Sequence, residues 1–328
     1  MRAPHPACLL ALAVLSAGCI QTRISVELLT QLHDDGSCTR RVSYRLERVD
    51  SDQGGARVAI PRDEDPLRQF RIPAQDPWHR RDEAETGLHV VTVEAVLPSP
   101  AAVDGDYTRS RSPRAAPSRN AVSAFVDAEH GLYDYREVLQ DPASPLAGAR
   151  LLARLALRAD EGFAARFAAN AGENTALPPS AEVRRLFRDL FAAPFARDIA
   201  ALAERPFYGP RERHDLEAIF DRLGARQKEL AVRLLAATPG RSQDELEETT
   251  DRAIDQMAEP LLAELEAAGL PLLGPEGLDA VRFHATLVMP APIVRANTCV
   301  SGDSAEWDFD ENDLFGRGFE MWAVAQAR

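Results

Sequence analysis

Two groups of short segments, one toward each end of the chain, alternate apolar and polar residues. This alternation is typical of strands that bury one face on a core. In the first group, Asp35-Gly36 separates two such runs, which predicts a tight hairpin. A second hairpin is expected around Glu129-His130-Gly131. The predicted strands cover residues 24–32, 39–49, 88–97, 122–126 and 133–139 in the first group and 281–289, 293–296, 305–309 and 319–325 in the second.

Between these groups the apolar period lengthens to that of amphipathic helices. From Val183, apolar residues recur at i, i+3, i+4, i+7 and i+8, which places them on one helix face. Ser242 and Glu245 form a capping box for a helix running toward Ala268, which Pro260 interrupts or kinks. Two further helices are expected over residues 146–158 and across the apolar stripe of residues 216–234.

Two polar segments of the N-terminal region predict irregular structure. Residues 50–85 are rich in Asp, Arg and Pro and indicate loops. Residues 98–120 combine Pro, Ser, Gly and Asp with four arginines, and this composition predicts a mobile loop. We interpret its arginines as solvated charges that balance an acidic protein, although a partner site is the alternative. The arginines are Arg109, Arg111, Arg114 and Arg119.

The order of these segments predicts an α+β fold. N- and C-terminal strands would form one mostly antiparallel sheet, and about four helices would be inserted between them, on one face or end of the sheet. The expected segments are a leader at residues 1–18, a β segment at 19–144, a helical insertion at 145–276 and a closing β segment at 277–328.

Composition limits the classes of partner. Apolar residues make up 45% of the chain, which is enough for a packed core. The formal net charge is −13. Nucleic-acid binders need a basic footprint, so we expect no nucleic acid partner. The net charge also argues against electrostatic docking on anionic lipid.

The first 19 residues have the order of a secretory leader. Arg2 precedes an apolar run over residues 7–15, and small residues follow. The run is too short to span a membrane. The sequence Leu15-Ser16-Ala17-Gly18-Cys19 resembles a bacterial lipobox, although the family more often has Leu where Ser16 stands. An ordinary leader that is cut nearby is the alternative.

The lipobox resemblance implies a lipid anchor. In that family the cysteine becomes the first residue of the mature chain and carries acyl chains, so Cys19 is the expected lipidation site. Two or three acyl chains suffice for durable membrane anchoring. In enterobacterial lipoproteins an Asp after the cysteine favours the inner membrane, and this chain has Ile20 there. We therefore expect a lipid-anchored protein of the bacterial cell envelope, in the outer membrane.

The remaining cysteines suggest one disulfide. Cys8 leaves with the leader, which leaves Cys38 and Cys299 in a compartment that can be oxidising. A bridge would join the two ends of the domain and would stabilise it by about 4–5 kcal/mol in the chain-entropy model. Two free, buried thiols are the alternative.

The closing segment has a second resemblance. Residues 287–297, with Pro290 and Pro292 before Asn297, lead to Glu306-Trp307-Asp308-Phe309. Together with the Asp35-Gly36 hairpin, this arrangement resembles the closing sheet of LppM-like bacterial envelope lipoproteins. The likeness covers about a quarter of the chain and leaves out the helical segment. It implies an envelope protein that handles lipids, without catalytic residues.

No motif for catalysis, cofactor binding or metal binding is found. Gly-x-Ser-x-Gly, P-loop, Gly-x-Gly-x-x-Gly, His-Glu-x-x-His and Cys-x-x-Cys patterns are absent. Ser304, which has Asp303 beside it and could pair with His284, is better explained as a turn residue. Asp308, Asp310 and Asn312 imitate a calcium loop but lack its Gly and Glu. We expect Trp307 and Phe309 to point into the core and Asp308 and Asp310 to face water. His33-Asp34-Asp35 is an ordinary turn.

Two hypotheses for function follow. The first is a non-enzymatic envelope lipoprotein that binds a lipid or an envelope protein, with no cofactor. Its apolar helix faces would either enclose a lipid or, more simply, fill a core. The second hypothesis is an envelope hydrolase with a dispersed active site.

Overall fold

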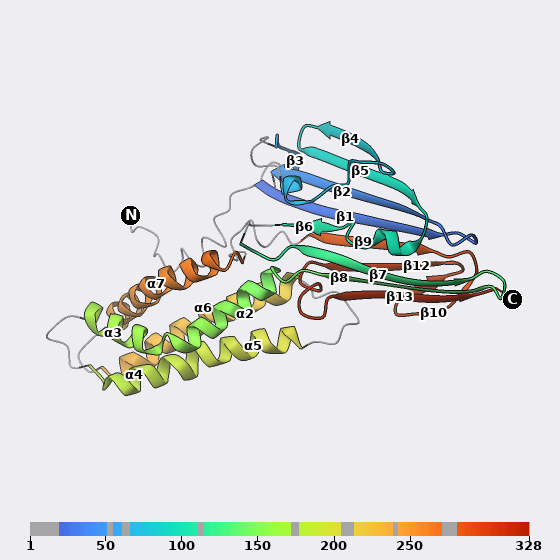
Figure 1. Cartoon of the computed structure of the whole chain (residues 1–328). Coiled ribbons are helices and arrows are strands. Elements are labelled where there is room, and N and C mark those ends of the chain that lie inside the picture. The colour runs from blue at the N-terminus through green and yellow to red at the C-terminus, as the bar shows by residue number, and fades with distance from the viewer. Residues whose placement is uncertain are drawn as a thin grey trace. The chain divides into compact units, whose positions relative to one another are not determined.

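The chain has an α+β fold, as predicted. Its structure, a computed structural model, describes residues 20–50, 55–60, 66–110, 114–171, 177–204, 213–238, 242–270 and 281–327. Cys8, Cys19 and the leader expected at residues 1–18 lie outside the described residues. Two compact units share the chain (Figure 1). Cys19–Ser144 and Asp279–Arg328 belong to the unit that holds the strands, and Pro145–Arg205 and Glu212–Leu278 belong to the unit that holds the helices.

The larger sheet of the strand unit has eight strands. Their order is β11-β12-β9-β1-β2-β5-β4, and β3 pairs with β2. Pairing is antiparallel except between β1 and β9. The strands are β1 (Ile20–Leu32), β2 (Cys38–Asp50), β3 (Ala56–Arg57), β4 (His79–Glu85), β5 (Leu88–Leu97), β9 (Arg282–Val288), β11 (Cys299–Ser301) and β12 (Ser304–Asp310).

The smaller sheet has five strands in the order β10-β13-β8-β7-β6, and all of its described pairs are antiparallel. The strands are β6 (Thr108–Arg109), β7 (Ser118–Asp127), β8 (Leu132–Gln140), β10 (Ile293–Ala296) and β13 (Phe319–Gln326).

The prediction of one sheet was wrong, because the C-terminal strands divide between two. β9, β11 and β12 extend the sheet of β1, whereas β10 and β13 extend the sheet of β8. Alternation shows that each strand buries one face, but it does not show which strand is the neighbour. Inward side chains of both sheets join one core, which makes this unit a β-sandwich. That core includes Val26, Leu28, Val42, Leu46, Val93, Tyr135, Leu139, Phe283, Leu287, Trp307, Phe309, Met321 and Ala323.

Both segments that were predicted to be loops contain ordered structure. Residues 50–85 include β3, a short 3₁₀ helix at Pro66–Gln69, and β4. Within residues 98–120 lie a second 3₁₀ helix, Pro100–Val103, then β6 and the start of β7. This second segment is held by burial of its own side chains, since Val103 and Tyr107 belong to the sandwich core. Arg111 lies outside the described residues.

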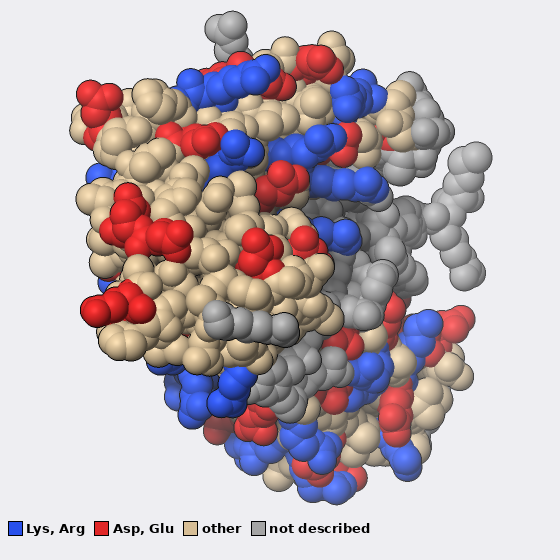
Figure 2. Space-filling model, turned by 90° about the vertical axis from the view of Figure 1, so that its right-hand side faces the viewer, with Lys and Arg blue, Asp and Glu red and all other residues tan. Residues whose placement is uncertain are grey.

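One end of the sandwich is formed by three acidic turns. We call the end that holds residues 33–37, 127–131 and 301–304 the turn end. The first two of these turns meet there, because the Tyr133 hydroxyl donates to the Asp34 carboxylate at 2.7 Å. Figure 2 looks onto this end. Asp and Glu side chains stand out from one uncharged area of its surface, and Lys and Arg side chains gather in the region above that area. These three turns contain no Lys or Arg, and their acidic residues are Asp34, Asp35, Asp127, Glu129 and Asp303.

The helical unit has five continuous helices in its described residues, where we expected about four. The additional helix is α3, whose Ala-rich sequence lacks a strong apolar stripe. Its neighbour α2 begins at Pro145, a residue suited to a first helical turn. The helices are α2 (Pro145–Arg158), α3 (Asp160–Ala171), α4 (Ser180–Phe187) continuing through a π turn (Arg188–Ala192) into α5 (Ala193–Ala203), α6 (Arg213–Ala236) and α7 (Gln243–Ala267).

Local sequence explains where these helices widen and end. The π turn ends two residues before Pro194, which has no N–H to continue the α-helical ladder. Ser242 and Glu245 form the predicted capping box. Helix α7 continues through Pro260 to Ala267, so the proline does not interrupt it. It ends in a Schellman motif in which Gly269, at φ +66°, donates to Glu266 and Leu270 donates to Leu265.

The apolar helix faces fill the core of the helical unit. Phe163, Phe187 and Phe191 stack in a column, with ring centroids 4.5 Å apart for the first pair and 5.3 Å for the second. Leu230, Leu234 and Met257 complete the same cluster. This packing agrees with the simpler of the two interpretations of these faces. Among the described residues, no helix has both the length and the hydropathy that crossing a membrane requires.

Candidate functional site

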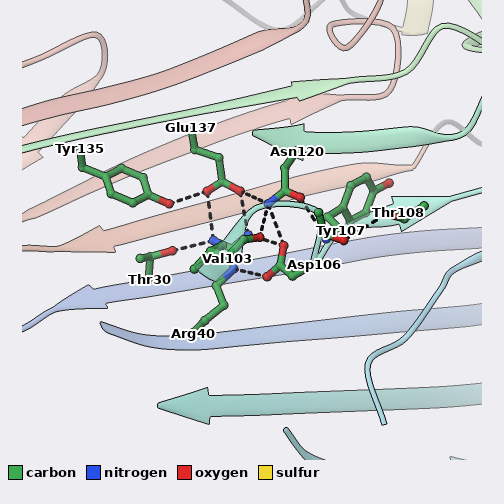
Figure 3. A network of polar contacts seen from close by, with 10 residues as sticks. Thr30, Arg40, Val103, Asp106, Tyr107, Thr108, Asn120, Tyr135 and Glu137 are labelled. Atoms are coloured by element: carbon green, nitrogen blue, oxygen red, sulfur yellow. Dashed lines mark hydrogen bonds and ion pairs between the residues drawn. The ribbon is translucent and has the colours of Figure 1, made fainter. Parts of the chain in front are cut away.

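The most concentrated polar chemistry in the sandwich lies inside its core. Alternation along β2 points Cys38, Arg40 and Val42 inward, so a guanidinium enters the space between the sheets. Glu137 occupies an inward position of β8 on the opposite sheet. Asp106 reaches the same point from the segment after β5 (Figure 3). The side chains of all three are at most 2% exposed.

The guanidinium of Arg40 uses all of its donors within this network. An arginine has five N–H groups. Nε donates to Asp106 at 2.8 Å, Nη1 donates to Thr30 at 2.6 Å and to Glu137 at 3.1 Å, and Nη2 donates to Glu137 at 2.8 Å and to Asp106 at 3.5 Å. The two carboxylates therefore clamp one cation from two sides.

Asn120 and Tyr135 complete the network. The Asn120 amide nitrogen donates to Asp106 at 2.7 Å and to Glu137 at 2.8 Å, and its oxygen accepts from the Tyr107 backbone N–H. The Tyr135 hydroxyl donates to Glu137 at 2.8 Å. The network thus joins β1, β2, β7 and β8 across the two sheets, because its members come from all four strands.

One positive and two negative groups make this network electrostatically unbalanced. Burial raises the pKa of Asp106, Arg40 opposes the rise, and the neighbouring Glu137 carboxylate adds to it. A carboxyl group with a raised folded-state pKa stabilises the fold at low pH and loses that contribution as pH rises. The network therefore favours binding of a proton at Asp106.

A second buried ion pair lies beside the first network. Arg109, from β6, donates through Nη1 to Glu311 at 2.6 Å and through Nε and Nη2 to Gln69. Its guanidinium also lies 5.0 Å from the ring centre of Phe70. Arg109 is therefore a structural residue, contrary to the expectation that it is one of several solvated arginines.

Next to this ion pair, the expectation that Asp310 faces water was wrong. Trp307 and Phe309 are buried as predicted and Asp308 is exposed, but Asp310 is only 8% exposed. Its backbone N–H donates to Asp313, and its carboxylate accepts from the Asn312 backbone N–H at 2.7 Å. Burial, followed by the Asp313 carboxylate, raises the pKa of Asp310 to about 7.

This shift predicts that the free energy of unfolding falls as pH rises. The folded pKa of Asp310 lies above its ordinary value of 3.8. Its contribution is therefore fully present below pH 3.8 and is lost as pH rises through about 7. Asp310→Asn keeps an oxygen for the Asn312 N–H and should flatten this dependence. Urea midpoints across the window measure it, with the exposed Glu306→Gln as control. Equal slopes in Asp310→Asn and in the unmodified protein would contradict the assignment.

The geometry limits what the Arg40 network can do chemically. Every donor of the guanidinium is used inside the core, and the side chains are sealed from solvent. The network fixes the two sheets against each other, but its guanidinium offers no free donor to a substrate. In the described part of the chain, no group of three or more His, Cys, Asp or Glu side chains is arranged to hold a metal ion.

The strand register separates the serine and histidine considered for a hydrolase. Ser304 lies opposite Val288, whereas His284 lies opposite Asp308. Four residues along a strand separate the two side chains by about 13 Å. His284 instead contacts the Asp308 carboxylate at 2.8 Å on the exposed face. The turn interpretation of Ser304 agrees with its position between β11 and β12.

Cys38 and Cys299 are free thiols, so the structure does not contain the predicted disulfide. Cys38 is buried on β2 and Cys299 is exposed on β11, and β1, β9 and β12 lie between these two strands. Four strand spacings amount to about 19 Å, far beyond the 7 Å limit for two bridged Cα atoms. Sequence spacing could not reveal this separation because it depends on sheet order.

The residues that resemble LppM-like proteins have structural roles here. The Asn297 side-chain oxygen accepts from the Trp307 indole N–H and from the Trp322 backbone N–H, each at 3.0 Å. Its amide donates to the Glu320 carbonyl at 2.7 Å. Asn297 therefore ties β12 of one sheet to β13 of the other, which explains why an Asn-containing turn precedes a Trp-x-Phe strand.

Sequence reasoning missed the Arg40 network, although a signal was present. In its strand, Arg40 alternates with the apolar residues Cys38 and Val42, so it lies on the same face as they do. Glu137 in the same way shares a face with Tyr135 and Leu139. A charged residue on the apolar face of a strand predicts a buried partner of opposite charge. Asp106 and Asn120 gave no such signal, because composition alone assigned their segment to a mobile loop.

Comparisons with known proteins assign no family. No protein-family model matches the chain, and no curated protein matches it significantly. Support for a function therefore comes from the lipobox-like sequence, the sandwich and its surface.

Proposed function

We propose that this chain is a lipid-anchored protein of the bacterial envelope whose sandwich serves as a non-enzymatic binding module. The observation that carries the proposal is the position of the lipobox-like sequence relative to the fold. Cys19, the residue that such a sequence lipidates, directly precedes β1, which begins at Ile20. Cleavage before Cys19 would leave a mature chain that starts at the sandwich.

The sandwich itself supports a binding role over catalysis. The polar groups of the Arg40 network bind one another and hold the two sheets together. Ser304 and His284, which were considered for hydrolysis, lie apart. The outer surface of the sandwich and its two ends are available to a partner. The resemblance to LppM-like lipoproteins supports a lipid or an envelope protein as that partner, and Ile20 supports the outer membrane as the location.

Replacing Cys19 tests the anchor. In cells fed an alkynyl fatty acid, the unmodified protein should acquire the label, and Cys19→Ser should acquire none, because the acylated thiol is gone. Cys299→Ser removes the exposed thiol of the sandwich and should leave labelling unchanged. Label on Cys19→Ser equal to that on the unmodified protein would refute the proposed anchor.

A further inference from the structure

Beyond the anchor itself, the sandwich has a geometry that restricts how it can stand on a membrane. β1 and β2 each have 13 residues, so their hairpin is about 43 Å long. Hydrogen-bonded pairing runs along its whole length, from Leu32↔Cys38 to Ile20↔Asp50. The lipid-bearing residue would therefore connect to a rigid two-stranded ribbon, with no flexible segment between them.

The charges along this ribbon are distributed unevenly. The three turns at the turn end carry the five acidic residues described above and no Lys or Arg. We call the opposite end, where β1 begins and β2 ends, the basal end. Arg57 pairs there with Val49 through β3, and Arg282 lies opposite Ser25 of β1. The arginines with exposed side chains toward the basal end are Arg23, Arg57, Arg68, Arg71, Arg119, Arg282 and Arg317.

Several acidic groups toward the basal end are neutralised or sealed. Glu311 pairs with Arg109, Asp310 is buried with a raised pKa, and Asp50 is only 9% exposed. Glu85 is exposed but lies 3.2 Å from Arg57, so these two charges offset each other, and the positive excess comes from the other arginines. In the described residues, the exposed charge near Ile20 is therefore more positive than the net charge of −13 suggests, and the acidic excess lies elsewhere.

We propose that the basal end of the sandwich rests on anionic lipid headgroups and that the turn end is held away from them. This inference depends on the proposed anchor at Cys19. Acyl chains on Cys19 would place Ile20 at headgroup level, within one residue of the bilayer. The exposed arginines would then contact lipid phosphates. The length of the ribbon would hold the acidic turn end about 40 Å away, and repulsion would disfavour the reverse orientation, in which the turn end meets the lipid. The global charge argued against such docking, but charge acts locally, within a Debye length of about 10 Å.

A matched pair of labels tests this orientation. In a Cys299→Ser background, Ala56→Cys marks the basal end and Ala128→Cys marks the turn end. Both alanines are exposed, and the remaining thiol of the sandwich, Cys38, is buried. Each acylated protein is labelled with a small fluorophore and bound to vesicles of equal parts phosphatidylcholine and phosphatidylglycerol that contain a headgroup spin label.

The label at residue 56 should be quenched several-fold more than the label at residue 128, and the ratio should fall in vesicles of phosphatidylcholine alone. Equal quenching of the two labels, or a ratio that does not depend on anionic lipid, would overturn the proposed orientation. Intact mass separates this failure from failure of the anchor. Protein that carries acyl mass and binds vesicles, but shows equal quenching, retains the anchor and loses the orientation. Protein without acyl mass refutes both.

Discussion

Replacing Arg40 by methionine should lower the free energy of unfolding of the sandwich by about 3–5 kcal/mol. The substitution removes the only cation in the described contacts between Asp106 and Glu137 and leaves two carboxylates sealed in the core. At least one of them must then bind a proton or remain buried without compensation. Urea denaturation followed by tryptophan fluorescence measures the loss, since Trp307 lies in the same core.

Arg41→Met is the matched control for that experiment. Arg41 is the next residue of β2 and pairs with Glu94 at 2.8 Å, but its side chain is 47% exposed. Exposed ion pairs contribute about 0–1 kcal/mol, so this variant should stay close to the unmodified protein. An Arg40→Met variant that unfolds at the same urea concentration as Arg41→Met would show that the buried network does not stabilise the sandwich.

The second large effect is expected in the helical unit. Phe187 is fully buried and stacks between Phe163 and Phe191. Phe187→Ala should therefore lower the free energy of unfolding of this unit by about 3–5 kcal/mol. Loss of helical circular dichroism in urea measures the change. The same experiment distinguishes a core from a lipid-binding surface, because a side chain that lined a ligand site would cost far less to remove in the ligand-free protein.

Val232→Ala provides the control within the same unit. Val232 lies on α6 and is 46% exposed, and surface substitutions usually change stability by about 0.5 kcal/mol or less. If Phe187→Ala and Val232→Ala unfold alike, the aromatic column does not hold the helical unit together.

The fold class and most strands followed from the hydrophobic pattern. The β1–β2 and β7–β8 hairpins, the capping box at Ser242 and the split between strands and helices all depend on local periodicity, which one sequence displays directly. The division into two sheets did not follow, because it depends on which distant strand supplies the hydrogen-bonding partner. The disulfide failed for the same reason, since Cys38 and Cys299 lie on strands that three others separate.

The candidate site was harder to predict than the fold. Arg40 and Glu137 could have been recognised as charges at inward positions. Asp106, Arg109 and Asn120 could not, because their segment has the composition of a mobile loop. What orders it is burial: Val103 and Tyr107 enter the sandwich core, and its polar groups find partners on other strands. Composition shows how polar a segment is, but it does not show whether other strands supply hydrogen-bond and ion-pair partners for its polar groups.

Lipidation of Cys19, at the start of a mature chain that enters β1 at once, is the proposal on which the others depend. The most direct test is the intact mass of the unmodified protein purified from bacterial membranes. We expect a chain that starts at Cys19 and is heavier than its amino-acid sequence by the mass of a diacylglyceryl group and attached acyl chains. A chain that starts at another residue, or one that starts at Cys19 with no added mass, would contradict it.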